Sequence, residues 1–213
     1  MRATEKIRKD LAAVFRHDPA ARSKAEVILT YSGFHALVLY RFAHFLYVHR
    51  YKLLARMVSQ FAKFLTGIEI HPAARIGHGV VIDHGEGVVI GETAQVGNNV
   101  LIYQGVTLGG TGKDKGKRHP TIEDGVMISA GAKVLGPFTV GKNAKVGAGS
   151  IVLKEVPPNA TVVGVPGRIV KIGNERVDDL CQSLPDPMGD ELKALSERVA
   201  ALEEKLNANN KES

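Results

Sequence analysis

The chain has 213 residues, a formal net charge of +6, 44% hydrophobic residues and only 6% aromatic residues. This hydrophobic content excludes a wholly disordered chain, and the length predicts one or two structural units. The basic residues are scattered and form no aromatic–basic motif, so we expect no nucleic-acid partner despite the positive charge.

The sequence favours a cytoplasmic protein. Its single cysteine, Cys181, cannot form an intramolecular disulfide, which favours a reducing compartment. The N-terminus has no apolar run of the signal-peptide type. The most apolar stretch, Phe34–Val48, contains His35, Arg41 and His44, and it is too short and too polar to span a bilayer. We therefore expect no membrane contact.

Residues 1–67 are expected to form a helical region. Ala3–Phe15 consists largely of helix formers. Gly33–Arg50 and Lys52–Leu65 are amphipathic and rich in aromatic residues, with no proline and no interior glycine. Gly67 then ends the helical run.

An apolar residue recurs every six positions from Ile70 to Val152, with a single break. The break lies between Val106 and Ile122, sixteen residues apart, which equals one step of six plus an insertion of ten. Twelve of the thirteen positions are Val or Ile. The positions are Ile70, Ile76, Ile82, Val88, Ala94, Val100, Val106, Ile122, Ile128, Val134, Val140, Val146 and Val152.

A period of six fits neither a helix nor a long strand, but it fits a short β segment followed by a turn. Three such sides close one coil of a parallel β-helix, with the repeated apolar residue pointing inward. Frequent glycines supply the tight corners. We therefore predict a mainly β protein with a β-helix domain over residues 68–173. The alternative is an ordinary sandwich with regular turns.

Residues 174–213 are expected to form a linker and a helix. Pro185 and Pro187 break the chain before an a/d heptad seam that runs from Met188 to Leu206, which predicts a coiled-coil helix. The alternative is an amphipathic helix folded back on its own subunit. The seam residues are Met188, Leu192, Leu195, Val199, Leu202 and Leu206.

The inserted loop, Gly112–Pro120, is the first candidate for a functional site, because a loop that leaves a regular coil often builds one. It contains Arg118, His119 and several lysines, although a solvated surface loop would have a similar composition. The preceding Gly109-Gly110-Thr111 segment allows a ligand to approach the backbone closely.

The second candidate is His84, which follows Asp83. Glu69 precedes His84 by fifteen residues, and a regular coil repeats every eighteen, so the two residues can lie near one corner on adjacent coils. A carboxylate that holds an imidazole fixes its tautomer and supports the imidazolium formed on proton uptake. A single histidine is nevertheless more often structural than catalytic.

Three segments together carry a resemblance to a known family. They are IEIHPAARIGHGVVIDHGEGVVIGETAQVG, VTLGGTGKDKGKRHPTIEDGVMISAGAKVLG and VGAGSIVLKEVPPNATVVGVPGRIV, and they are preceded by RHDPA. From about residue 15 to residue 171 the chain resembles the bacterial serine O-acetyltransferases, a family of hexapeptide-repeat acyltransferases. The resemblance implies a left-handed β-helix and the transfer of acetyl from acetyl-CoA to L-serine in cysteine biosynthesis.

The resemblance also implies residue roles. His84 corresponds to the general base, and Glu69 to its carboxylate partner, which is often Asp in the family. The set that binds serine corresponds to Asp18, Asp83, Arg118 and His119. The set that binds the CoA arm corresponds to Gly110, Thr111, Ala130, Ala148 and Lys145.

The family uses acetyl-CoA as co-substrate with no permanently bound cofactor and no metal, and it acts as a trimer that L-cysteine inhibits. Here the chain end, Asn209–Ser213, lacks the terminal Ile by which relatives dock into cysteine synthase, so we expect no tight complex with that enzyme. The heptad segment and the short N-terminal helical region favour a free homotrimer over the hexamer that longer family members form. Three alternatives remain: an acetyltransferase for sugars or antibiotics, a non-catalytic trimeric scaffold, and a zinc-dependent hydratase. The hydratase would bind zinc through residues among His71, His78, His84 and His119.

Overall fold

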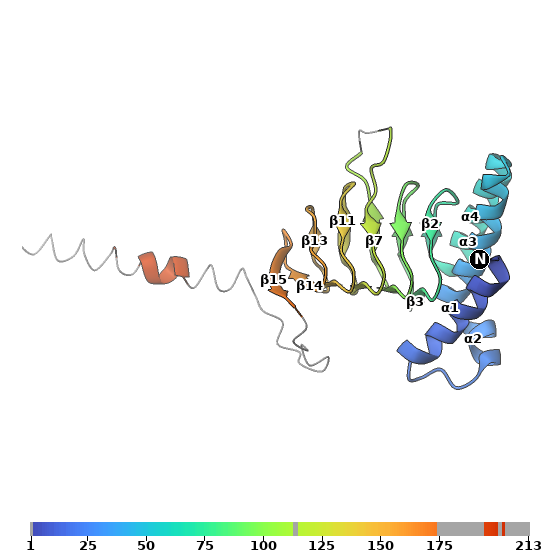
Figure 1. Ribbon diagram of the computed structural model, residues 1–213, viewed down its shortest axis with the longest axis horizontal. Coiled ribbons are helices and arrows are strands. Elements are labelled where there is room, and N and C mark those ends of the chain that lie inside the picture. Colours follow the sequence, from blue (N-terminus) through green and yellow to red (C-terminus); the bar gives the residue numbers. More distant parts are fainter. Residues whose placement is uncertain (1, 113–114, 174–193, 200–201, 203–213) are drawn as a thin grey trace, which may run out of the picture. The chain divides into compact units, whose positions relative to one another are not determined.

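The computed structural model describes residues 2–112, 115–173, 194–199 and 202. The chain forms two compact units, Met1–Glu175 and Arg176–Ser213. In the first unit, helices are followed by short strands that wind around a common axis (Figure 1). In the second unit, residues 194–199 are helical. Most of the predicted heptad segment Met188–Leu206 lies outside the described residues, so the coiled coil stays a prediction.

The N-terminal region is helical, as predicted. One helix, α2, was not predicted, because its seven residues are too few to show a helical period. Its N-cap Ser23 accepts a hydrogen bond from the Glu26 N–H at 3.2 Å, which satisfies one free donor of the first turn. Gly67 ends the last helix in a left-handed conformation, with φ at 69°. The helices are α1 (Ala3–His17), α2 (Lys24–Thr30), α3 (Ser32–Val48) and α4 (Lys52–Thr66).

None of the described helices is both long enough and apolar enough to cross a membrane.

In the described residues, fifteen short strands form three sheets. Sheet A has the order β1-β4-β7-β10-β13, sheet B the order β2-β5-β8-β11, and sheet C the order β3-β6-β9-β12-β14-β15. Neighbouring strands are parallel except β14 and β15, which are antiparallel. The strands are β1 (Glu69–Ile70), β2 (Arg75–Ile76), β3 (Val81–Asp83), β4 (Val89–Ile90), β5 (Gln95–Val96), β6 (Leu101–Tyr103), β7 (Thr107–Gly109), β8 (Thr121–Ile122), β9 (Met127–Ile128), β10 (Lys133–Leu135), β11 (Thr139–Val140), β12 (Lys145–Val146), β13 (Ile151–Val152), β14 (Ala160–Val163) and β15 (Arg168–Ile172).

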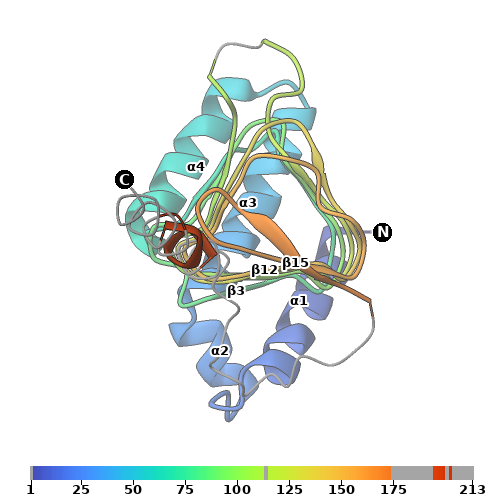
Figure 2. The same cartoon turned by 90° about the vertical axis from the view of Figure 1, so that its left-hand side faces the viewer.

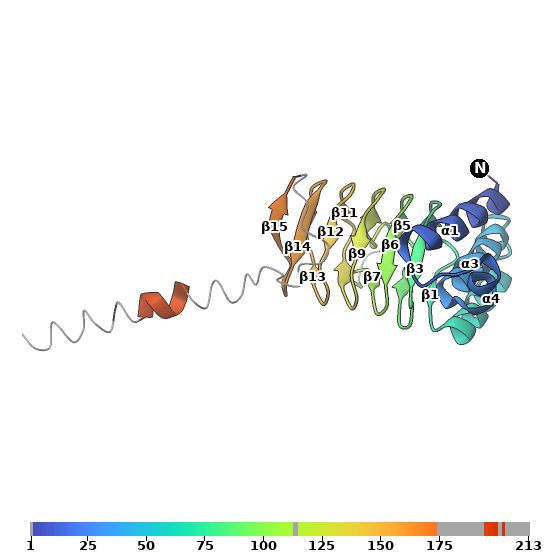
Figure 3. The same cartoon turned by 90° about the horizontal axis from the view of Figure 1, so that it is seen from below.

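The three sheets form the sides of a triangle when viewed along the axis (Figure 2), and the coils stack on one another (Figure 3). The predicted parallel β-helix is therefore confirmed. One side of a coil can contribute two buried residues that are two positions apart in the sequence. Val88 and Ile90, for example, are 0% and 1% exposed. Burying one such side chain stabilises the fold by about 1.5–3 kcal/mol, and the repeat adds this contribution at every side.

The position of the insertions differs from the prediction. Ile70 pairs with Ile90, twenty residues later, whereas Ile90 pairs with Leu108 after eighteen. The turn after β3 is therefore two residues longer than a regular corner, and the later loop contains eight extra residues rather than ten. The two extra residues do not interrupt the six-residue apolar pattern in the sequence. Ile90 takes the place in sheet A that Ile70 has one coil earlier, and Val88, two residues before it, is also buried and continues the count of six.

Side chains from the helices satisfy the backbone groups that the first coil cannot pair. This coil has a neighbouring coil on only one side, so the N–H and C=O of Ile76 face the helices without a strand partner. The Tyr40 hydroxyl accepts the Ile76 N–H at 3.2 Å. Ser59 Oγ donates to the Ile70 carbonyl at 2.7 Å. The helices therefore cap the open end of the β-helix.

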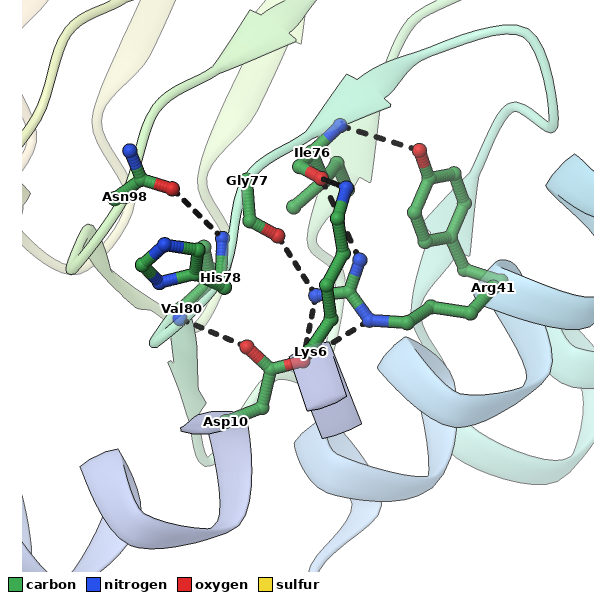
Figure 4. Close-up of polar contacts among 9 residues, drawn as sticks. Lys6, Asp10, Arg41, Ile76, Gly77, His78, Val80 and Asn98 are labelled. Atoms are coloured by element: carbon green, nitrogen blue, oxygen red, sulfur yellow. Dashed lines mark hydrogen bonds and ion pairs between the residues drawn. The ribbon is translucent and has the colours of Figure 1, made fainter. Parts of the chain in front are cut away.

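A buried ion pair lies at the centre of this cap (Figure 4). Arg41 Nη2 lies 2.5 Å from Asp10 Oδ2 and also donates to the Gly77 carbonyl at 2.8 Å. Asp10 Oδ1 accepts the Val80 N–H at 3.2 Å. The Asp10 and Arg41 side chains are only 1% and 5% exposed, so each charge needs the other as its partner to offset the free-energy cost of burial. The pair thus joins α1, α3 and the first coil.

We predict that Asp10→Ala lowers the free energy of unfolding by about 3–5 kcal/mol, because it leaves the Arg41 charge buried without a partner. Urea unfolding followed by circular dichroism measures the loss. Lys9→Ala, at an exposed position of the same helix, is the matched control and should change stability by less than about 0.5 kcal/mol. Equal stability of the two variants would contradict the capping role.

Candidate active site

The predicted site residues lie mainly at two corners of the β-helix. The His84 corner comprises the turns that lead from sheet C into sheet A. The loop corner comprises the turns that lead from sheet A into sheet B, including the inserted loop after β7. Sheet A separates the two corners within one chain.

At the His84 corner, the longer turn exposes His84 and holds its backbone at φ 56°. Such a conformation is uncommon for a residue other than glycine, and surrounding contacts must maintain it. Ser32 Oγ donates to the His84 carbonyl at 3.0 Å. Gly33 lies directly against β3, since a Cβ there would be 1.9 Å from the Ile82 carbonyl oxygen. The start of α3 therefore fixes the backbone that carries His84.

Two carboxylates of the predicted serine-binding set lie near this corner. The Tyr31 hydroxyl donates to Asp18 Oδ2 at 2.7 Å, and Asp18 Oδ1 accepts the Ala20 N–H at 2.7 Å. The hydrogen bond to Asp18 raises the pKa of Tyr31 to about 12, with smaller contributions from burial and from other charges that include Asp83. Asp18 and Asp83 are thus both near Tyr31. Two carboxylates on one surface suit a ligand ammonium group.

Glu69 is the first residue of β1 and begins at the same corner as His84. Its carboxylate, however, pairs with Lys63 of α4 at 2.5 Å. No hydrogen bond joins Glu69 to the His84 ring in the part of the chain that the structure describes. The expected contact between the two side chains therefore stays a prediction.

At the loop corner, Arg118 is oriented by Glu92, a residue that the sequence analysis did not single out. Arg118 Nη2 lies 2.5 Å from Glu92 Oε2, and both side chains are partly exposed. The hydrogen bond from Arg118 lowers the pKa of Glu92, so the pair stays ionised in neutral solution. The paired guanidinium is thereby held in one place with further N–H groups available for an anion.

His119 is buried at this corner, with 8% of its surface exposed. Its ring lies over Gly91, where a Cβ would come within 2.0 Å of the ring carbon Cδ2. Thr93 contacts both His119 and the backbone of the loop. Burial is the main cause that lowers the pKa of His119, and the Arg118 charge lowers it further, so the ring is neutral near pH 7.

The residues predicted to bind CoA are divided between the corners. Gly110 and Thr111 lie between β7 and the inserted loop, at the loop corner, whereas Ala130 and Ala148 lie on consecutive coils of the His84 corner. Lys145 lies in β12 of sheet C. Residues 113 and 114 of the loop are outside the described residues. A hollow of about 770 Å³, lined by the outer face of sheet B and by residues of α1 and α3, contains none of the predicted site residues.

The histidines considered as zinc ligands do not form one group. His71 and His119 lie at the loop corner and His84 at the opposite end of sheet A, while His78 lies between sheets B and C. Among the described residues, no three His, Cys, Asp or Glu side chains are grouped so that they could hold a metal ion.

Comparisons with known proteins agree on one family. The model described as "Serine acetyltransferase, N-terminal" matches residues 1–38, and "Bacterial transferase hexapeptide (six repeats)" matches residues 119–154. The serine acetyltransferase of Bacillus licheniformis is 55% identical over 208 residues, which cover 97% of this chain and 96% of that protein. That of Bacillus subtilis is 56% identical over 202 residues, which cover 94% and 93%. The chain belongs to the serine acetyltransferase family.

Solved structures of serine acetyltransferases have the same fold. The structure from Neisseria gonorrhoeae superimposes with a TM-score of 0.80 at 46% identity, covering 82% of this chain and 68% of that one. The same enzyme in complex with serine gives a TM-score of 0.77 at 46% identity, covering 79% and 69%. A serine acetyltransferase in complex with cysteine gives a TM-score of 0.78 at 48% identity, covering 79% of this chain and 70% of that one. A serine acetyltransferase in complex with CoA gives a TM-score of 0.75 at 46% identity, covering 79% and 69%.

We predict that Gly91→Ala disturbs the site of this serine acetyltransferase, because the added methyl group would overlap the His119 ring. Overpacking of this kind costs about 1–3 kcal/mol of stability, and displacement of His119 should also weaken serine binding. Thermal unfolding and the KM for serine measure both effects. Gly116→Ala is the control, since its Cβ would meet no atom within 4 Å. A Gly91→Ala enzyme that matched this control in both measurements would contradict the prediction.

Proposed function

We propose that this protein transfers the acetyl group of acetyl-CoA to the hydroxyl of L-serine, giving O-acetyl-L-serine and CoA. The proposal is based on three kinds of side chain at two corners of one β-helix. Asp18 and Asp83 can bind an ammonium group, Arg118 can bind a carboxylate, and His84 is an exposed histidine that can act as a base. Family membership supports the reaction, and the matched structures with serine and with CoA support the substrates. A cytoplasmic location fits such a reaction.

His84 is assigned the role of general base. In this step the histidine removes the hydroxyl proton of serine, the oxygen attacks the thioester carbonyl, and the C–O bond forms as the C–S bond breaks. The proton then passes to the CoA thiolate. A positioned base contributes about 10²–10⁴-fold to the rate. No covalent enzyme intermediate is required, and the alignment of both substrates supplies a further acceleration.

Serine is assigned to charged groups from both corners. Asp18 and Asp83 suit its ammonium group, and Arg118 suits its carboxylate as a bidentate donor. His119 is assigned to the same serine-binding set. L-Cysteine differs from L-serine only in sulfur for oxygen, so the same groups can hold it as a competitive inhibitor. The matched structure with cysteine supports this inference.

A complete site requires a second copy of the chain. A three-residue strand such as β7 spans about 10 Å, which separates His84 from Arg118 by more than the reach of one serine molecule. We infer a homotrimer in which the His84 corner of one subunit meets the loop corner of the next. Exposed apolar side chains of α4, which packs beside β1 of sheet A, support self-association on this side. They include Leu53, Met57, Phe61 and Phe64, which are 77%, 60%, 56% and 85% exposed.

The first test is release of free thiol from acetyl-CoA in the presence of single amino acids and of sugars. The proposal expects turnover with L-serine and none with sugars. A preference for a sugar hydroxyl would favour an acetyltransferase for sugars instead.

The absence of a tight cysteine synthase complex stays a prediction, because the chain end lies outside the described residues.

We predict that His84→Ala lowers turnover more than about 100-fold while CoA still binds, because only proton removal is lost. Thiol release and calorimetric titration with CoA measure the two properties. His49→Ala, at an exposed position, should retain wild-type turnover. A His84→Ala enzyme with more than a tenth of the wild-type rate would remove His84 from the role of base.

The inferred subunit arrangement makes a complementation prediction. His84→Ala and Arg118→Ala chains are each inactive or impaired alone, but a mixed trimer contains some sites with an intact His84 from one chain and an intact Arg118 from the next. Random co-assembly should restore about a quarter of the wild-type activity, since each site draws on two chains of a ring. Separately purified trimers that are mixed without exchange form the control. No recovery in co-expressed trimers would place the whole site within one chain.

A further inference from the structure

Thr93 lies where the turn after β4 meets the inserted loop. Its Oγ1 accepts hydrogen bonds from the backbone N–H of Arg118 at 3.0 Å and of His119 at 3.1 Å. A threonine hydroxyl has two acceptor lone pairs and one proton, so these two bonds fill its acceptor capacity. The hydroxyl proton is left for a third partner, and His119 Nδ1 lies 2.8 Å from Oγ1.

The same residue determines which nitrogen of His119 carries the proton. The backbone N–H of Thr93 also approaches His119 Nδ1, at 3.2 Å. A backbone N–H can only donate, so Nδ1 accepts and is unprotonated. The proton of the neutral ring is therefore on Nε2. Among the described residues Nε2 has no hydrogen-bond partner, and it is thus the ring atom that can donate to a bound ligand.

We propose that Thr93 is a positioning residue, which fixes the His119 tautomer and the backbone of Arg118 so that both side chains present donors to the substrate. The inference rests on the proposed serine-binding roles of these two residues. Thr93 has no part in the proton transfer or the acyl transfer. It acts only through the loop, and its hydroxyl is the group on which the arrangement depends.

The charges around His119 are consistent with a neutral donor. Arg118 and Lys117 of the loop oppose a positive charge on the ring, while Glu92 of the turn after β4 favours one. His71, in the turn after β1, is close enough for its own pKa to be affected by His119. Lys117 also donates to the Thr93 carbonyl at 2.9 Å, so the loop is held to this turn by side chains on both sides.

The kinetic test compares Thr93→Val, which keeps the shape of the side chain without its hydroxyl, with Thr93→Ser, which keeps the hydroxyl. We expect Thr93→Val to raise the KM for serine about tenfold, with kcat and the KM for acetyl-CoA within about threefold of wild type. Thr93→Ser should remain within about threefold in all three. Thr139→Val in β11 is the matched control and should behave as wild type. A wild-type serine KM in Thr93→Val, or equal losses in the Val and Ser variants, would overturn the proposal.

The spectroscopic test needs no substrate. In protein labelled with nitrogen-15 at histidine, the His119 ring signals are identified by their loss in His119→Gln. We expect an unprotonated Nδ1 and a protonated Nε2 in wild type and Thr93→Ser. We expect a mixture of tautomers in Thr93→Val, because loss of the hydroxyl releases the N–H groups of Arg118 and His119 and lets the ring move away from the Thr93 backbone N–H. A protonated Nδ1 in wild type would overturn the assigned tautomer even in an active enzyme. Failure of the wild type to acetylate serine would instead overturn the proposed function, while this measurement would still decide the tautomer.

Discussion

The whole structure depends on how the backbone polar groups at the open end of the β-helix are satisfied. Each interior coil bonds to a coil on either side, but the first coil has one such neighbour and a row of N–H and C=O groups without strand partners. Tyr40, Arg41 and Ser59 supply the missing partners from the helices. The helical region is therefore a required end cap of the β-helix and not a separate attachment.

This cap also connects the fold to the chemistry. Ser32 and Gly33, at the start of α3, pack against the end of β3 and hold the left-handed backbone at His84. The neighbouring Tyr31 holds Asp18. The same helix carries Arg41, whose pairing with Asp10 fixes α3 to the first coil. A disturbance of the buried ion pair would consequently reach the proposed base and the proposed ammonium site through one rigid helix.

Much of the fold could be predicted from the sequence, because a six-residue apolar period is a local pattern that only a few architectures can bury. The two extra residues at His84 could not be located, since each side of a coil buries two positions and Val88 continues the pattern after the shift. Glu92 and Thr93 could have been found by asking which residues lie one coil before the inserted loop. The ion pair between Lys63 and Glu69 could not be predicted, because it depends on how α4 packs against sheet A and the repeat pattern contains no information on that packing.

The antiparallel pair β14–β15 has a consequence for solubility. A parallel β-helix presents complementary edges at its two ends, and bare edges of this kind can add strands from other molecules and grow into fibres. Here β15 turns back along β14, and the register shifts between Thr161 and Val162, so the terminal edge is bent and no longer matches an incoming coil. In the described part of the chain, the helices cover the first coil and β15 covers the edge of sheet C, so growth from the ends is disfavoured and association is directed to the sides of the β-helix.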